Sequence, residues 1–98
     1  MAVSVKVVRS GKEVVVAACD SELLDKTLTT GKTRFHIQPG FFGGKFLSVE
    51  EAISEVESGT SVNLVGKKIV QRAIEAGLVH PEAVVYISGV PHALIFKI

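Results

Sequence analysis

The sequence predicts one α+β domain, residues 1–98, in which two main helices pack against a largely antiparallel sheet. Three observations lead to this fold class. Alternating apolar and polar residues near both ends of the chain are typical of half-buried strands. Two central segments repeat apolar residues at every third or fourth position, which is typical of helices with one buried side. A chain of 98 residues also has the length of a single domain with a modest core.

The N-terminal region predicts a pair of antiparallel strands. Residues 2–9 place Val3, Val5 and Val7 on one face, with polar residues on the other face. The tetrapeptide Ser-Gly-Lys-Glu then provides a turn. Residues 14–19 return as an apolar strand that is expected to be buried on both faces.

Shorter elements are expected between this strand pair and the helices. Asp20 or Ser21 is positioned to cap a short helix. Residues 32–38 contain β-branched and aromatic side chains that favour a third strand. Pro39-Gly40 should end that strand.

The central region predicts the two main helices. The first follows Ser48, which forms a capping box with Glu51 because the two are spaced as S-x-x-E. Its apolar stripe runs to Gly59, which should end it. The second helix is expected over residues 61–77, with Gly77 at its C-terminus.

The C-terminal region predicts a second strand pair. Residues 83–88 form a short apolar strand, and Gly-Val-Pro then turns the chain. Residues 92–98 supply the last strand. The fold therefore has strand pairs at both ends and its helices in the middle.

Composition and charge exclude several classes of protein. Hydrophobic residues make up 47% of the chain and charged residues 21%, which is typical of a folded globular protein. The net charge of +1 gives no overall attraction to nucleic acid or membranes, so any electrostatic binding must be local. Cys19 is the only cysteine, and neither a signal peptide nor a membrane span is recognisable. We expect a cytoplasmic protein that does not bind membranes.

Gly31-Lys32-Thr33 matches the end of a phosphate-binding loop. That motif requires a glycine five positions earlier, where this chain has Lys26. It also requires a helix that begins at Lys32, whereas the following residues predict a strand. A nucleotide loop is therefore rejected, and no cofactor is expected.

The same region has a second property that favours RNA binding. Residues 26–49 contain no Asp or Glu, but they contain four Lys or Arg side chains and four of the five phenylalanines. Cations neutralise phosphates and aromatic rings stack on unpaired bases. The alternative is that the phenylalanines fill the core while the cations are solvated. The candidate RNA-binding residues are Lys32, Arg34, Phe41, Phe42 and Lys45.

Catalytic candidates are few. Cys19 precedes Asp20 at a strand-to-helix junction, where a helix N-terminus can lower the pKa of a thiol. His92 could complete such a site in a cleft. The alternative is that Cys19 is a small buried core residue. The three histidines lack the spacing of metal ligands, so no metal site is expected.

Several motifs, in order and spacing, resemble a small archaeal family known as domain of unknown function 424. These are AACDSELLDKT, FFGG, NLVG, AIEAGLVHPE and ISGVPHA, and the resemblance extends from about Val3 to the C-terminus. This chain has Asp25 where members tend to have glycine, and Phe42 where they tend to have tyrosine. The resemblance implies an archaeal cytoplasmic protein with one α+β domain and no established activity. The shared motif positions are Cys19, Asp20, Gly43, Gly44, Asn63, Gly66, Gly89, Pro91 and His92.

Three functional hypotheses follow. The first is a non-enzymatic module that binds RNA or a ribonucleoprotein. The second is a protein-interaction or self-assembly domain, which would form a homo-oligomer in the latter case. The third is a small enzyme that uses Cys19, Asp20 and His92. The acid-free basic and aromatic region favours the first.

Overall fold

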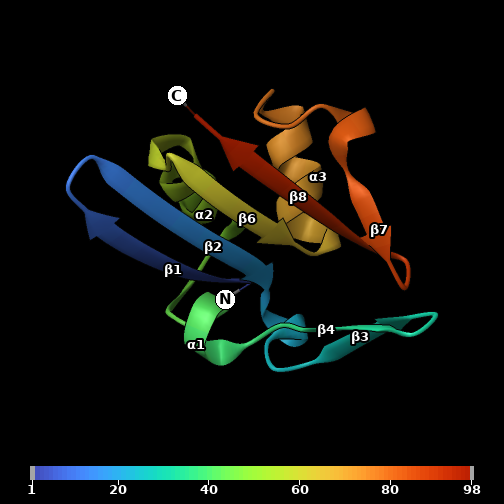
Figure 1. Ribbon diagram of the computed structural model, residues 1–98. Helices are drawn as coiled ribbons and strands as arrows, with labels where there is room; N and C mark the ends of the chain where they lie inside the picture. The colour runs from blue at the N-terminus through green and yellow to red at the C-terminus, as the bar shows by residue number, and fades with distance from the viewer. Residues whose placement is uncertain (1, 98) are drawn as a thin grey trace.

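The computed structural model describes residues 2–97, and its largest element is a six-stranded sheet with strand order β5-β1-β2-β6-β8-β7 (Figure 1). The strands of this sheet are β1 (Val3–Ser10), β2 (Glu13–Asp20), β5 (Lys45–Leu47), β6 (Ser61–Val65), β7 (Val85–Ile87) and β8 (Val90–Phe96). Every neighbouring pair is antiparallel except β2 and β6, which are parallel. The predicted α+β class and the predicted strand pairs at both ends of the chain are confirmed.

The N-terminal pair is a regular hairpin. Val3 pairs with Asp20, and the register continues without a break to Ser10 and Glu13. Gly11 occupies the turn with φ +58°, a left-handed conformation that costs glycine little. Alternation along β1 places Val3 and Val5 in the main core, as the sequence predicts.

The predicted helix over residues 61–77 is wrong in its first part. Residues Ser61–Val65 form β6, the central strand that pairs with both β2 and β8. The helix α3 (Lys67–Glu75) begins after Gly66, which has φ +122°. Both strand and helix tolerate a short apolar run, and the neighbouring strands decide the conformation here.

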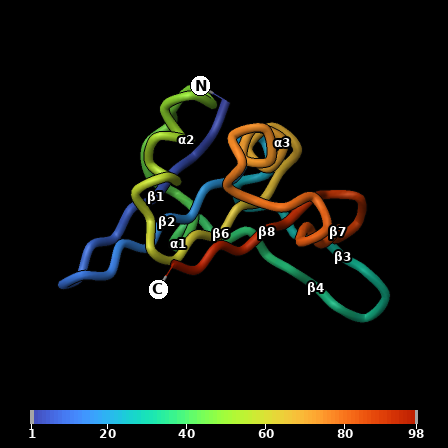
Figure 2. Tube along the Cα trace, turned by 90° about the horizontal axis from the view of Figure 1, so that it is seen from above, coloured from blue at the N-terminus to red at the C-terminus, as the bar shows by residue number. Residues whose placement is uncertain are grey.

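Two helices cover one face of the sheet. α2 (Val49–Ser58) and α3 lie together on that face, as the view from above shows (Figure 2). The predicted capping box is present: Ser48 Oγ accepts from Glu51 N at 3.1 Å, and Glu51 Oε1 accepts from Ser48 N at 2.9 Å. The side chains of α2 and α3 pack on Val16, Val62 and Leu64 in an aliphatic core.

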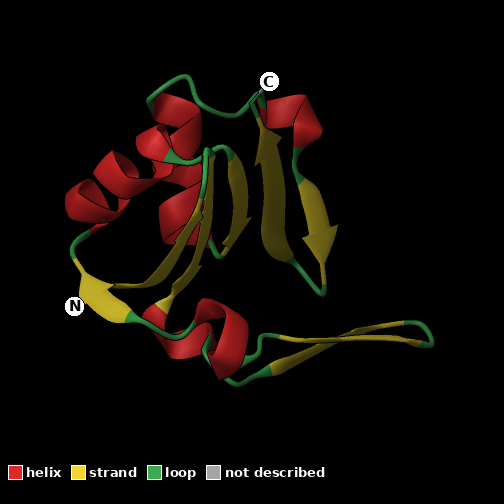
Figure 3. Cartoon of the chain, turned by 60° about the vertical axis from the view of Figure 1, so that its left-hand side comes forward, coloured by secondary structure: helices red, strands yellow, loops and turns green. Residues whose placement is uncertain are grey.

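The opposite face carries a smaller layer that the sequence predicted only in part. Its elements are the 3-10 turn η1 (Ser21–Leu23), the hairpin strands β3 (Thr27–Thr30) and β4 (Thr33–His36), and the short helix α1 (Pro39–Phe42). Cys19, Ile37, Phe42 and Val65 form a second buried cluster beneath this layer. The hairpin itself projects away from the body of the protein (Figure 3).

Asp25 explains how this layer turns back on itself. It has φ +70°, in the left-handed region that glycine adopts most readily. Its carboxylate Oδ1 lies 2.8 Å from His36 Nε2, across the base of the hairpin. An aspartate therefore occupies a tight backbone turn, and its side chain contacts the strand on the other side of the hairpin.

The remaining segment returns from α3 to the C-terminal strands. The 3-10 turn η2 (Pro81–Ala83) precedes β7, and the turn to β8 contains Ser88 and Gly89, both at positive φ. Residue 98, the end of the last predicted strand, lies outside the described residues. Among residues 2–97, no helix is long and apolar enough to cross a membrane.

Candidate functional site

The three catalytic candidates do not meet. Cys19 lies on the face covered by α1, whereas Asp20, the next residue of β2, points to the face covered by α3. The strand register places Cys19 beside Val65, and Val65 beside His92. His92 is therefore two strand spacings from Cys19, roughly 10 Å between Cα atoms, and Val65 lies between them.

Cys19 is also chemically unsuited to nucleophilic attack. Its side chain is fully buried. Burial, with smaller contributions from the nearby carboxylates of Asp20 and Glu22, raises the pKa of the thiol to about 12. A buried thiol that stays protonated has the role of a small apolar side chain, the alternative that the sequence left open.

Asp20 has a structural role at the N-terminus of α3. It is 2% exposed, and its two carboxylate oxygens accept from Lys68 N at 2.9 Å and from Ile69 N at 3.0 Å. Burial raises the pKa of this carboxyl group, while the two backbone hydrogen bonds lower it in part. Gly66 leaves room for the carboxylate, because a Cβ at that position would lie 2.3 Å from Asp20 Cγ.

His92 forms a small polar site with Asn63. Its Nε2 lies 2.8 Å from Asn63 Oδ1, and since that oxygen only accepts, Nε2 carries the proton. The imidazole also stacks on Phe35, with ring centroids 5.3 Å apart and an interplanar angle of 24°. Burial lowers the pKa of His92. The neutral imidazole of His92 thus contacts both Asn63 and Phe35, and the stacking on Phe35 connects the β3–β4 hairpin to β8.

The projecting hairpin carries two of the predicted RNA-binding cations. Lys32 and Arg34 are exposed, as is Lys26 at its base. Leu28 and Phe35 pair across the hairpin and pack towards the second cluster, so Arg34 and its partner Thr29 face outward. The Ser88 hydroxyl donates to the Thr29 carbonyl and joins the β7–β8 turn to the hairpin.

The two neighbouring phenylalanines of α1 have different surroundings. Phe42 is 2% exposed and fills the second cluster, so it cannot stack on a base and is withdrawn from the candidate surface. Phe41 is 43% exposed and contacts its neighbour edge to face. It lies over the sheet beside Val8 and Val15.

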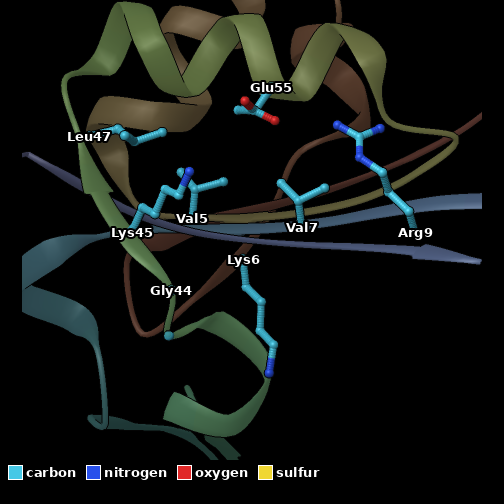
Figure 4. Close-up of a pocket in the computed structure, with 9 residues that line it drawn as sticks. Val5, Lys6, Val7, Arg9, Gly44, Lys45, Leu47 and Glu55 are labelled. Atoms are coloured by element: carbon cyan, nitrogen blue, oxygen red, sulfur yellow. The ribbon is translucent and has the colours of Figure 1, made fainter.

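Lys45 does not share a surface with the hairpin cations. It lies on β5 opposite Val5, and its side chain is on the side of the sheet that α2 covers (Figure 4). There it lines a groove of about 590 Å³ together with Val7, Arg9 and Glu55. Arg9 and Glu55 carry no signal in the sequence, because these residues come from distant elements and share no local pattern.

The remaining family-motif positions have structural roles. A Cβ at Gly43 would lie 2.4 Å from the Pro39 carbonyl oxygen, and one at Gly44 would lie 2.1 Å from that of Val5. Gly89 turns the chain at φ +77°, and the Pro91 carbonyl accepts from Gly66 N at 2.9 Å. Within residues 2–97, no group of three or more His, Cys, Asp or Glu side chains is arranged to hold a metal ion.

Taken together, these features define a small α+β protein whose sheet is covered by two helices over most of one face and by a smaller layer over part of the other. A model of the family described as "Protein of unknown function (DUF424)" matches residues 8–98, so the chain belongs to this family. The resemblance predicted from the sequence is thereby confirmed.

One solved structure extends the comparison. The crystal structure of an uncharacterized conserved protein from Methanopyrus kandleri is similar, with a TM-score of 0.82 and 24% sequence identity. The similarity covers 98% of this chain and 93% of that chain, and it shows a shared fold. No curated protein matches the chain significantly.

Proposed function

We propose that this protein is a cytoplasmic, non-enzymatic module of an archaeal cell that binds single-stranded RNA, alone or within a ribonucleoprotein. The observation that supports the proposal is the projecting hairpin with Lys26, Lys32 and Arg34 exposed along it. Among the described residues, none of these three cations forms an ion pair with a carboxylate. The charge of Lys32 and Arg34 is therefore available to phosphates, and Lys26 adds to it although it also acts on the Glu22 carboxylate.

The base of the β3–β4 hairpin leads to an exposed aromatic ring. After β4, the chain continues through Ile37 into α1, whose Phe41 is half exposed above the sheet. A strand of RNA held by the hairpin cations can reach this ring, and stacking on an exposed ring does not depend on base identity. Binding of this kind combines charge with stacking, and it needs no catalytic group.

A titration of labelled RNA tests the proposal. The probe is a fluorescein-labelled single-stranded RNA of mixed sequence, about 20 nucleotides long, followed by anisotropy. With three phosphate contacts the slope of log K against log salt is about −2, so affinity should fall roughly 20-fold between about 50 and 200 mM salt. Absence of binding, or binding that does not change with salt, would refute the proposal.

Matched variants locate the contact. Lys32→Glu and Arg34→Glu should each weaken binding several-fold, because a phosphate contact is replaced by a like charge. The control is Lys12→Glu, which lies in the β1–β2 turn, away from the projecting β3–β4 hairpin, and should have little effect on RNA binding (Figure 1). Phe41→Ala should weaken the free energy of RNA binding by about 1–3 kcal/mol if a base stacks on this ring. Equal losses for Lys12→Glu and Arg34→Glu would show that no local site exists.

A second candidate function is protein interaction, including self-assembly. It is favoured by exposed apolar side chains on the open face of the sheet: Val8 is 49%, Leu94 51% and Phe96 71% exposed. These side chains share the face of Val15 and Asn63 through the strand register. Size-exclusion chromatography with light scattering tests self-assembly, and a monomer at high concentration would argue against it.

A further inference from the structure

Strand β1 is paired along only part of its outer edge. β5 pairs with it from Val3 to Val5, whereas β2 pairs with its whole length on the other side. Within residues 2–97, no strand pairs with residues 6–10 on the β5 side. The outer half of β1 is therefore an open sheet edge, a position where another strand can be added.

The backbone groups of this edge have a defined direction. The Val5 carbonyl oxygen points outward towards β5, since a Cβ on Gly44 would lie 2.1 Å from it. Alternate residues of an antiparallel strand direct their N–H and C=O groups to the same edge. Val7 and Arg9 therefore present their backbone groups to the open side, where a further strand would exchange hydrogen bonds with them.

The open edge forms the floor of the groove shown in Figure 4. Arg9 and Lys45 extend along the α2 side of the sheet, and Glu55 points down from α2 between them. Lys6 points to the other side, where its Nζ donates to the Gly40 carbonyl at 2.6 Å. Arg9 and Lys45 belong to no ion pair among the described residues, so the groove has a cation at each end.

The spacing of these cations defines the occupant. Lys45 is opposite Val5, four residues along β1 from Arg9. Four residues of extended chain span about 14 Å, so two acidic residues separated by three others can reach both cations. Gly44 occupies the edge at Val5, so the added segment must leave the sheet after pairing with Val7.

We propose that the open edge of β1 is a strand-addition site for an extended segment of a partner protein that carries acidic residues at both ends. Main-chain hydrogen bonds to Val7 and Arg9 supply the pairing, and the two cations select the charge. A second copy of this chain fits less well, because pairing through the same edge would bring like charges together. The site is separate from the proposed RNA surface on the hairpin.

A short peptide tests this site directly. The probe is a fluorescein-labelled Glu-Thr-Val-Gly-Glu peptide, blocked at its C-terminus and followed by anisotropy. Its glycine lets the backbone leave the edge after the valine pairs with Val7. We expect saturable binding at least about tenfold tighter than that of Lys-Thr-Val-Gly-Lys. The peptide that is N-methylated at its valine should bind at least about tenfold more weakly, because it lacks the amide hydrogen and its methyl group points towards the edge.

Variants of the protein assign the peptide to the groove. Arg9→Glu and Lys45→Glu should each weaken binding of the acidic peptide. Arg9→Glu should also strengthen binding of the lysine peptide. Both positions are exposed, so the fold should be retained, and circular dichroism checks this. Arg34→Glu on the hairpin is the matched control and should not affect either peptide. Conversely, Arg9→Glu should leave RNA binding unchanged, which separates this site from the RNA site.

Three outcomes would overturn the proposal. The first is no binding of the acidic peptide to the unaltered protein. The second is equal affinity of the N-methylated and parent peptides, which would exclude strand pairing. The third is that the unaltered protein does not bind the peptide but forms a concentration-dependent dimer, and that Arg9→Glu abolishes this dimer. That result would assign the edge to a second copy of the chain.

Discussion

The two faces of the six-stranded sheet differ in what covers them. On one face, α2 and α3 bury aliphatic side chains such as Val16, Leu64 and Ile69. On the other face, α1 and the hairpin cover only the part of the sheet around Cys19 and leave Leu94 and Phe96 exposed. The covered face thus accounts for most of the core, whereas the partly covered face carries the projecting hairpin and the exposed apolar side chains.

The first prediction tests how far α1 buries the partly covered face of the sheet. Phe42→Ala should lower the free energy of unfolding by about 3–5 kcal/mol, because a buried ring is lost from the cluster. Phe41→Ala should cost about 1 kcal/mol or less, because that ring is half exposed. Urea unfolding measures both. Equal costs would show that the two rings are buried to the same extent.

The second prediction concerns the reactivity of the same cluster. A maleimide should label Cys19 in the folded protein at least about 1,000-fold more slowly than in the unfolded chain, because the pKa of the thiol is raised to about 12. Labelling at neutral pH with and without denaturant measures the ratio. Rates within about tenfold of each other would show that this face opens readily to solvent.

The third prediction probes the junction beneath α3 on the covered face. Gly66→Ala should lower the free energy of unfolding by at least about 2 kcal/mol, because φ is +122° and the added Cβ would clash with the Asp20 carboxylate. Gly31→Ala is the control: its φ is +57°, but no atom lies within 4 Å of its added Cβ. Its cost should be about 1 kcal/mol. A control as costly as Gly66→Ala would assign the whole effect to the backbone angle.

The smallest expected effect is a pH dependence from Asp20. Its folded-state pKa is raised above the ordinary 3.8, mainly by burial, so the folded protein holds this proton more tightly than the unfolded chain. Protonation therefore stabilises the fold, and this stabilisation is lost as pH rises from 3.8 through the folded-state pKa.

Comparison with Asp20→Asn isolates this contribution. The free energy of unfolding of the natural protein, minus that of the variant, should decrease as pH rises across this window. Urea titrations at several pH values measure the difference. A difference that is constant or increases with pH would mean that the hydrogen bonds from Lys68 and Ile69 outweigh burial.

The success of the sequence predictions depends on whether a signal is local. The α2 capping box between Ser48 and Glu51 and the N-terminal hairpin were predicted because their partners are neighbours in the chain. The sequence predicts the start of a helix where β6 lies, because Ser61–Val65 is short and apolar. The hairpin strand Thr27–Thr30 was missed because its polar surface gives no alternation.

The candidate sites show the same limit more strongly. The basic character of the hairpin was visible in the sequence, but nothing there distinguished buried Phe42 from exposed Phe41. Cys19, Asp20 and His92 share the family's motifs, yet the pleat and the strand order separate them. The groove between Arg9, Lys45 and Glu55 had no sequence signal at all.

The sequence by itself determined the fold class, the capped helix α2, the terminal strand pairs and the absence of acidic residues between residues 26 and 49. These properties arise from hydrophobic periodicity and from contacts between residues a few positions apart. Only the tertiary structure decided the strand order, the burial of Cys19 and the open edge of β1. These depend on which distant segments meet, and the free energy of such contacts resides in packing that no local pattern encodes.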